Sequence, residues 1–150
     1  MAVVILALAV GAGMLSWKHH QDKQVDDRAL EAKEFAEKAV VRLLAYTPEN
    51  VSSDLDSESR LLTGSFKKDY RDLVTETIAP AAEKSKVTTK ADVVSAGVIR
   101  ASANRVDLLL FLNVISTTAA DKTPQVNGSR IEVRVERADG RWRIAKMDPV

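Results

Sequence analysis

Cysteine is absent from this 150-residue chain, and histidine occurs only as the neighbours His19 and His20. The lack of cysteine excludes disulfide bonds, thiol chemistry and a lipoprotein anchor. Adjacent histidines diverge on a helix and have no third ligand nearby, so they do not indicate a metal site. Neither sign of charge is in excess, since 22 basic and 21 acidic residues give a net charge of +1. The composition therefore favours no nucleic-acid partner.

Catalytic and ligand-binding motifs are also missing. Ser65-Phe66-Lys67-Lys68 has the Ser-x-x-Lys spacing of penicillin-binding enzymes, but their two partner motifs do not occur. Asp54, Asp56 and Glu58 lack the glycine turn and distal glutamate of a calcium loop, so we expect a solvated acidic face. Asn127-Gly128-Ser129 is a glycosylation sequon only in a glycosylating pathway. We therefore expect no catalytic, cofactor-binding or metal-binding residue, and we expect that the protein is not an enzyme.

An apolar run over residues 1–17 opens the chain, and no charge occurs before Lys18. A helix of that length would reach about 25 Å, slightly less than the ~30 Å hydrocarbon core of a bilayer. A cleaved signal peptide would have a basic segment before the apolar run, and a helix buried in a soluble protein would have an amphipathic stripe. Because the run shows neither, we predict a transmembrane helix over residues 1–17.

Small residues recur within the predicted span. Ala7 and Gly11 are four positions apart, as are Ala9 and Gly13, so a second transmembrane helix could approach closely on that side. Alanine and glycine are also common in spans generally, which accounts for them equally well. Trp17 and Lys18 stand where residues of the membrane interface are expected. A count of Lys18 and Lys23 alone would place the following domain in the cytoplasm.

Helical periodicity dominates the chain from the span to residue 86. Neither proline nor glycine interrupts residues 15–46, and alanines repeat at helical spacing over 25–46, so we predict a juxtamembrane helix over 18–46 that continues from the span into the domain. A short helix is expected around 51–62. Phe66, Tyr70 and Val74 begin a third, amphipathic helix that we expect to end near Pro80.

Alternation with a period of two begins after Lys86. The odd-numbered residues from Val87 to Ile99 are expected to share one face of a long strand, with a bulge or bend at Gly97. Beyond Asp107, the segment over residues 106–115 is apolar on both faces, which predicts a central strand covered on both sides. Residues 119–127 are expected to form a polar loop. A half-exposed strand over 131–136, the hairpin turn Asp139-Gly140 and a last strand led by Trp142 complete the order.

Helices followed by four strands indicate an α+β domain over residues 47–150, with three helices packed on a curved four-stranded antiparallel sheet. This order suits the cystatin-like cone of the nuclear-transport-factor superfamily. Some cones of this kind use a buried acid or base, for which Tyr70, Asp107 and Asn113 are the candidates. We expect Tyr70 instead to pack between helix and sheet, with its hydroxyl bonded or at the rim.

The chain resembles the Mce-associated membrane proteins of mycobacteria, the accessory proteins of the mammalian-cell-entry lipid importers. The similarity extends over nearly the whole chain and rests on the order of several short segments: Leu43-Leu44-Ala45-Tyr46, Leu62-Thr63-Gly64-Ser65-Phe66 with Tyr70, Ile78-Ala79-Pro80-Ala81-Ala82, Val94-Ser95-Ala96-Gly97-Val98 and Asp139-Gly140-Arg141-Trp142.

The resemblance implies a single-pass protein of the inner membrane with an extracytoplasmic domain, which stabilises or coordinates an importer of fatty acids or sterols. It implies a permease, other importer subunits and the bilayer as partners, and no catalytic residues. This orientation is opposite to the one that the count of Lys18 and Lys23 predicts. Two alternatives remain open: an assembly factor of the type IV secretion kind, which shares the layout of anchor and cone, and a lipid-binding or enzymatic cone.

Overall fold

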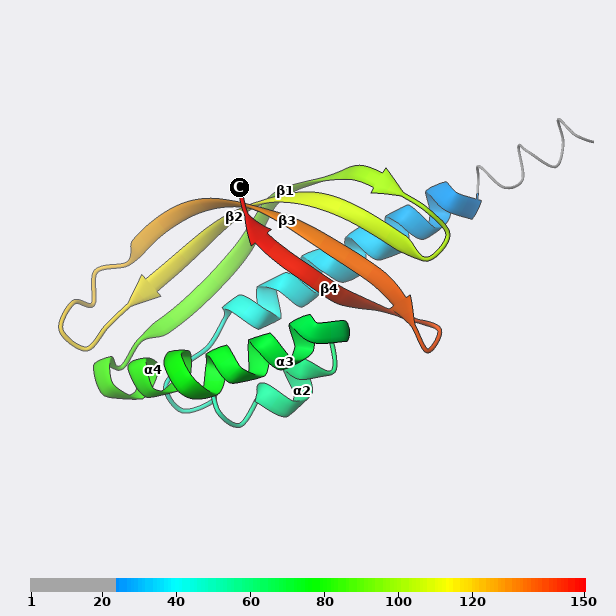
Figure 1. Ribbon diagram of the computed structural model, residues 1–150. Coiled ribbons are helices and arrows are strands. Elements are labelled where there is room, and N and C mark those ends of the chain that lie inside the picture. Colours follow the sequence, from blue (N-terminus) through cyan, green and yellow to red (C-terminus); the bar gives the residue numbers. More distant parts are fainter. Residues whose placement is uncertain (1–23) are drawn as a thin grey trace, which may run out of the picture.

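Four antiparallel strands curve around one long helix in the computed structural model, which describes residues 24–150 (Figure 1). Shorter helical segments close the open side of the arch, so the core lies between the helices and the inner face of the sheet. The α+β cone expected from the sequence is confirmed. The predicted transmembrane helix lies outside the described residues, and no helix within 24–150 is long and apolar enough to cross a membrane.

The first helix, residues 24–44, is the spine of the core. Its inner stripe consists of small residues, and Ala32, Ala36 and Val40 are 0% exposed. Alanine favours the helix intrinsically and lets its backbone approach the sheet closely. The chain leaves this helix before Tyr46, whose N–H and carbonyl bond to Thr89 at 3.0 and 2.8 Å. This bridge closes the gap between the first helix and the first strand.

The helices after the spine are α2 (Leu55–Ser59), α3 (Gly64–Leu73), the π-helical turn η1 (Val74–Ile78) and α4 (Ala79–Ser85). The expected end near Pro80 is wrong, because the helix runs on to Ser85. Pro80 falls in the first turn of α4, where the missing N–H of proline is tolerated. The helix ends at Lys86, whose left-handed backbone (φ 51°) turns the chain into the sheet.

The sheet is a meander of β1 (Thr88–Ala101), β2 (Arg105–Thr117), β3 (Gln125–Ala138) and β4 (Arg141–Pro149). Asp139 and Gly140 have φ angles of 50° and 74°, as a tight hairpin turn requires, which confirms the expected turn. The polar loop expected over 119–127 is shorter, because Gln125, Val126 and Asn127 already pair with β2.

Only one face of β2 is covered. Val106, Leu108, Leu110 and Leu112 are 0–2% exposed against the helices, whereas Phe111 is 40% exposed. All described helices lie on the inner side of the arch, so the expectation of a strand covered on both sides is wrong. The apolar residues on its other side form part of an uncovered surface, which we call the outer face.

Alternate side chains of β1 do not stay on one face of the sheet along the whole strand. Its register with β2 shifts between Val93 and Ser95 and again between Val98 and Arg100. Each bulge moves the following side chains to the opposite face. Val93 therefore pairs with the inward Leu112, whereas Ser95 pairs with the outward Phe111. The single face expected from Val87 to Ile99 is wrong, and the bulges flank Gly97 rather than coincide with it.

Candidate functional site

The three residues considered as acids or bases lie on opposite sides of the sheet. Tyr70 belongs to α3 and is buried on the helical side. Asp107 and Asn113 are on the outer face of β2, at positions that alternate with the buried leucines. Asn113 lies over Gly128, since a Cβ at that glycine would stand 4.0 Å from the Asn113 Oδ1. The three side chains therefore do not form one site.

Tyr70 is paired with Glu58, a residue that the sequence analysis placed on a solvated face. The tyrosine hydroxyl donates to the Glu58 Oε2 at 2.7 Å, and the Leu43 carbonyl oxygen is 3.4 Å away. Glu58 and Tyr70 are only 9% and 8% exposed. Asp56 is solvated as expected, with its carboxylate bonded to Arg71 at 2.7 Å. The assignment of Glu58 was therefore wrong, while the packing expected for Tyr70, with its hydroxyl bonded, is confirmed.

Burial controls the ionisation of this pair. Loss of solvent raises the pKa of Glu58, and the Tyr70 hydrogen bond opposes that rise only in part. The pKa of Tyr70 is raised far above its ordinary value, first by burial and then by the Glu58 carboxyl. Tyr70 is therefore a neutral hydrogen-bond donor at physiological pH. The pair connects α2 to α3.

A small apolar pocket adjoins Tyr70 at the mouth of the arch. Its volume is about 240 Å³. Drug-sized ligand pockets usually measure ~300–1,000 Å³, so this one falls below that range. Its walls come from the end of the first helix, the α3–η1 region and β4: Leu43, Leu44, Phe66, Asp69, Tyr70, Leu73, Ile78 and Met147. The rest of the cone interior contains buried side chains of the chain itself.

Asp107 serves in an ion pair on the outer face. Its carboxylate accepts from the Arg134 Nε at 2.7 Å and from the Arg105 Nη2 at 3.4 Å. Partial burial raises the pKa of Asp107, but the hydrogen bonds and charges of the two arginines outweigh it, so the net shift is downward. Lys146 pairs with Asp148 on the same face. The Asp107–Arg134 pair joins β2 to β3, whereas Arg105–Asp107 and Lys146–Asp148 each lie within one strand.

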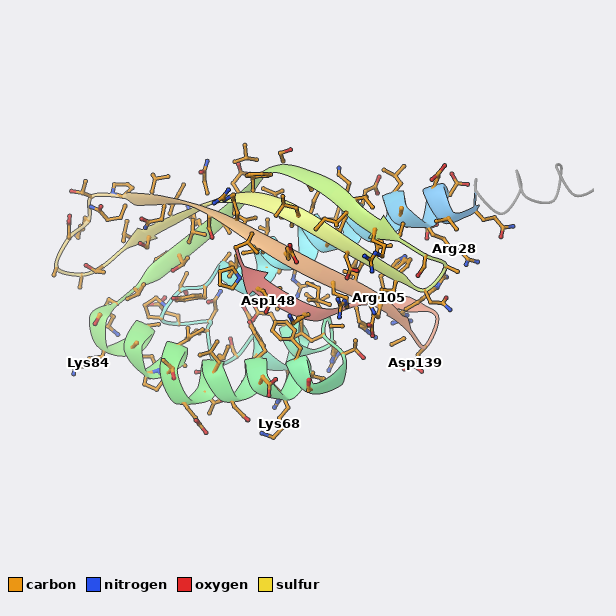
Figure 2. The ribbon with its side chains drawn as sticks, turned by 45° about the horizontal axis from the view of Figure 1, so that its top comes forward. Arg28, Lys68, Lys84, Arg105, Asp139 and Asp148 are labelled. Carbon is orange, nitrogen blue, oxygen red and sulfur yellow. The ribbon has the colours of Figure 1, made fainter. Side chains whose placement is uncertain are left out.

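The motif residues of the sequence analysis do not assemble into a site either. Lys68 is exposed, and Figure 2 shows it on the side of α3 away from the sheet. Its hydrogen bond to Asp72 raises the pKa of Lys68, which is the opposite of what a lysine general base needs. The sequon from Asn127 to Ser129 lies on β3. No group of three His, Asp or Glu within 24–150 is arranged to hold a metal.

The outer face carries the exposed apolar side chains of the sheet. Phe111 is 40% exposed, and Val94 and Val126 are 60% and 59% exposed. A broad hollow of about 500 Å³ lies beside Phe111, between the Val94 bulge and the chain end at Val150. Sequence reasoning missed this surface because it assigned a covering layer to both faces of β2. The predicted helix contacts Ala7, Ala9, Gly11 and Gly13, and the interface residues Trp17 and Lys18, lie outside the described residues.

Solved structures with the same arrangement include a type IV secretion system protein, a periplasmic domain and an NTF2-like protein. An IcmL-like type IV secretion system protein of Legionella pneumophila matches with a TM-score of 0.67 and 10% identity over 81% of this chain and 92% of its own. The periplasmic domain of DotI matches with a TM-score of 0.67 and 11% identity over 79% of this chain and 91% of its own. An NTF2-like protein with a cystatin-like fold from Novosphingobium aromaticivorans matches with a TM-score of 0.58 and 15% identity over 81% of this chain and 82% of its own. At such low identity these likenesses establish the fold alone.

Sequence relatives are found in Mycobacterium tuberculosis. The protein named outer membrane protein Rv1973 is 34% identical over 148 residues, which is 97% of this chain and 90% of the relative. The uncharacterized protein Rv1362c is 28% identical over 153 residues, which is 99% of this chain and 70% of that relative. Residues 1–150 also match the family described as uncharacterized proteins like Rv1363c/MT1408. The chain therefore belongs to the Rv1363c/MT1408-like family.

Proposed function

We propose that the chain is a non-catalytic, single-pass accessory subunit of the mycobacterial inner membrane, which stabilises or coordinates an Mce-type importer of fatty acids or sterols. The resemblance of its ordered short segments to Mce-associated membrane proteins supports this proposal. The name of the relative Rv1973, an outer membrane protein, is consistent with work in the cell envelope. In this proposal the cone is extracytoplasmic, and its partners are the permease and other importer subunits.

The uncovered outer face is the observation that carries the proposal. Strand β2 places Leu109 and Phe111 on the outer face, where no described element covers them, while its inner side is fully buried. Around them stand charged pairs such as Arg134 with Asp107. A surface with exposed aromatic and aliphatic residues and a polar surround is typical of protein interfaces. A cone that presents such a face beside a membrane is suited to bind neighbouring subunits.

A second candidate function is assembly of a type IV secretion-like machine. The fold likeness to the IcmL-like protein and to the periplasmic domain of DotI favours it. Both functions use the cone as a binding module, so they differ in the identity of the partner. The third possibility, a lipid-binding or enzymatic cone, receives less support. The pocket beside Tyr70 is small, and Tyr70 is a neutral donor already bonded to Glu58.

Site-specific crosslinking tests whether the outer face contacts partners. Phe111 is replaced by the photoreactive p-benzoylphenylalanine, which keeps an aromatic ring at a surface position. The matched control carries the same residue at Lys68, which is exposed on the helical side. Crosslinks from position 111 to importer subunits in native membranes would support the proposal, and crosslinks to secretion subunits would support the second candidate. Equal yields from both positions would contradict binding through the outer face.

The predicted transmembrane contact is tested separately. Ala7→Leu with Gly11→Leu enlarges two small residues that the proposal places against a permease helix. Recovery of the permease with the tagged chain should fall, whereas Leu6→Ala with Leu8→Ala should leave it unchanged. Unchanged recovery with the first pair would remove this contact from the proposal without affecting the outer face.

A further inference from the structure

One end of the domain gathers two turns and the beginning of the first helix. The Arg28 Nη1 donates to the Ala103 carbonyl oxygen at 3.3 Å, which fixes the helix start to the β1–β2 turn. The Arg137 backbone N–H donates to the Asn104 carbonyl oxygen at 2.9 Å, which fixes that turn to the end of β3. Figure 2 shows Arg28, Arg105 and Asp139 at this end, whereas Lys84 lies at the other.

Arginines are concentrated at this end. We call the group the arginine end, and it consists of Arg28, Arg100, Arg105, Arg137, Arg141 and Arg143, six of the 11 arginines in the chain. The segments of the opposite end, residues 79–90 and 113–127, contain lysines and no arginine. The same segments carry the carboxylates Asp26, Asp27, Glu136 and Asp139. Arg100 and Arg105 also line a hollow with Asp107, Glu132 and Asp148, together with the cations Arg134 and Lys146. Asp107 lies nearby, but its carboxylate also accepts from Arg134.

Two of these arginines are free to meet a ligand. Arg100 and Arg141 are exposed, and neither bonds to another side chain within the described residues. Arg137 and Arg143 have structural contacts, since the Arg137 guanidinium lies 5.8 Å from the Trp142 ring centre and the Arg143 guanidinium bonds to the Arg60 carbonyl oxygen. A guanidinium offers a planar fork of donors that matches phosphate oxygens.

The arginine end is also the part of the domain nearest to the predicted membrane span. Ala29 is the first residue of the helix that is buried against the sheet. Arg28 follows Trp17 by 11 positions, and a helical connection of that length would measure about 16 Å.

We propose that the arginine end binds the phosphate groups of anionic phospholipids and thereby docks the cone against the bilayer surface. The docking deepens the proposed function and rests on its membrane anchor. The two turns then face the lipid, and the β2–β3 loop points away from it. The outer face is left at the side of the docked cone, where neighbouring subunits can reach it.

Reconstituted protein comprising residues 1–150 tests the docking, and the absence of cysteine from these residues makes single labels unique. A fluorophore is placed at Ala103→Cys in the β1–β2 turn or at Ala120→Cys in the opposite loop, both exposed alanines. Vesicles are made of phosphatidylcholine alone or mixed with phosphatidylglycerol, with a headgroup-attached quencher. We expect quenching at position 103 in the anionic vesicles, relieved by salt, and none at position 120.

Charge variants separate docking from simple proximity. A basic residue close to an anionic membrane contributes roughly a fivefold gain in binding. The pair Arg100→Gln with Arg141→Gln should therefore lower the ratio of docked to undocked cones by about tenfold to thirtyfold. Lys84→Gln with Lys122→Gln removes the same charge at the opposite end and should change nothing. Quenching at position 103 that does not depend on the charge of the lipid, or that is unchanged by the two arginine substitutions, would overturn the docking.

Docking and anchoring can fail independently. Resistance to alkaline carbonate extraction reports the anchor, whereas quenching reports the docking. An anchored protein without lipid-dependent quenching would refute the docking and leave the anchor intact. An extractable protein that still binds anionic but not neutral vesicles through the arginine pair would uphold the docking and refute the anchor. If the label at position 103 is shielded in native membranes but not in lipid vesicles, that position contacts a protein, and this result would overturn the proposal.

Discussion

Replacement of Tyr70 by phenylalanine should destabilise the domain more strongly at pH 7 than at pH 4. The change keeps the ring in its buried position and removes only the hydroxyl that donates to Glu58 at 2.7 Å. Hydrogen bonds to a charged group contribute roughly 1.5–3 kcal/mol, and neutral ones about 0.5–1.5 kcal/mol. We therefore expect a loss of about 2 kcal/mol at pH 7, where Glu58 carries more charge, and about 1 kcal/mol at pH 4.

The direction of the pH effect follows from Glu58. Burial raises the pKa of Glu58 in the folded state, so the folded protein holds its proton more tightly than the unfolded chain. The resulting stability is fully present below the unfolded pKa, near ~4.3, and is lost as the pH rises through the folded pKa. Removal of the Tyr70 hydroxyl raises that folded pKa further. The penalty for Tyr70→Phe therefore grows with pH.

Urea unfolding followed by circular dichroism, with the full chain in a mild detergent, measures the loss. A change of about 2 kcal/mol should lower the urea midpoint by roughly 1 M. The control is Glu58→Gln, in which Tyr70→Phe should cost about 0.5–1.5 kcal/mol at both pH values because no charge remains. Equal losses at pH 4 and pH 7 in the native background would refute the role assigned to the buried carboxyl.

Two matched pairs test the sheet. Leu108→Ala should cost about 2–4 kcal/mol because Leu108 is fully buried, whereas Leu109→Ala on the outer face should cost less than about 1 kcal/mol; similar urea midpoints would contradict the two faces of β2. Gly140→Ala should cost about 1–2 kcal/mol because its φ is 74°, whereas Gly97→Ala should be neutral within about 0.5 kcal/mol because an added Cβ there meets nothing within 4 Å. A thermal melt showing equal shifts for both glycines would contradict the turn geometry.

Local patterns in the sequence were enough to predict the order of elements. The alanine repeat gave the first helix, the Asp139-Gly140 pair gave the last hairpin, and the periodicity of Phe66, Tyr70 and Val74 gave α3. These signals act through residues close in sequence, so they are readable without tertiary information. The order of strands followed because short turns join neighbouring antiparallel strands.

Features that depend on distant contacts were not predictable in the same way. The apolar run of β2 is compatible with one or two covering layers, and only the position of the helices decides between them. Glu58 is buried because α3 brings Tyr70 over it, 12 residues later in the chain. The bulges of β1 depend on its register with β2, and no motif around Val94 or Ile99 predicts that register.

The spine helix also determines how the domain bears mechanical load. Force applied from the N-terminal side acts along residues 24–44, whose buried stripe from Ala29 to Leu43 lies inside the arch. Extraction of this helix would have to break the contacts of its buried stripe with the core. Tension arriving from a moving neighbour would thus act directly on the helix that fills the core of the domain.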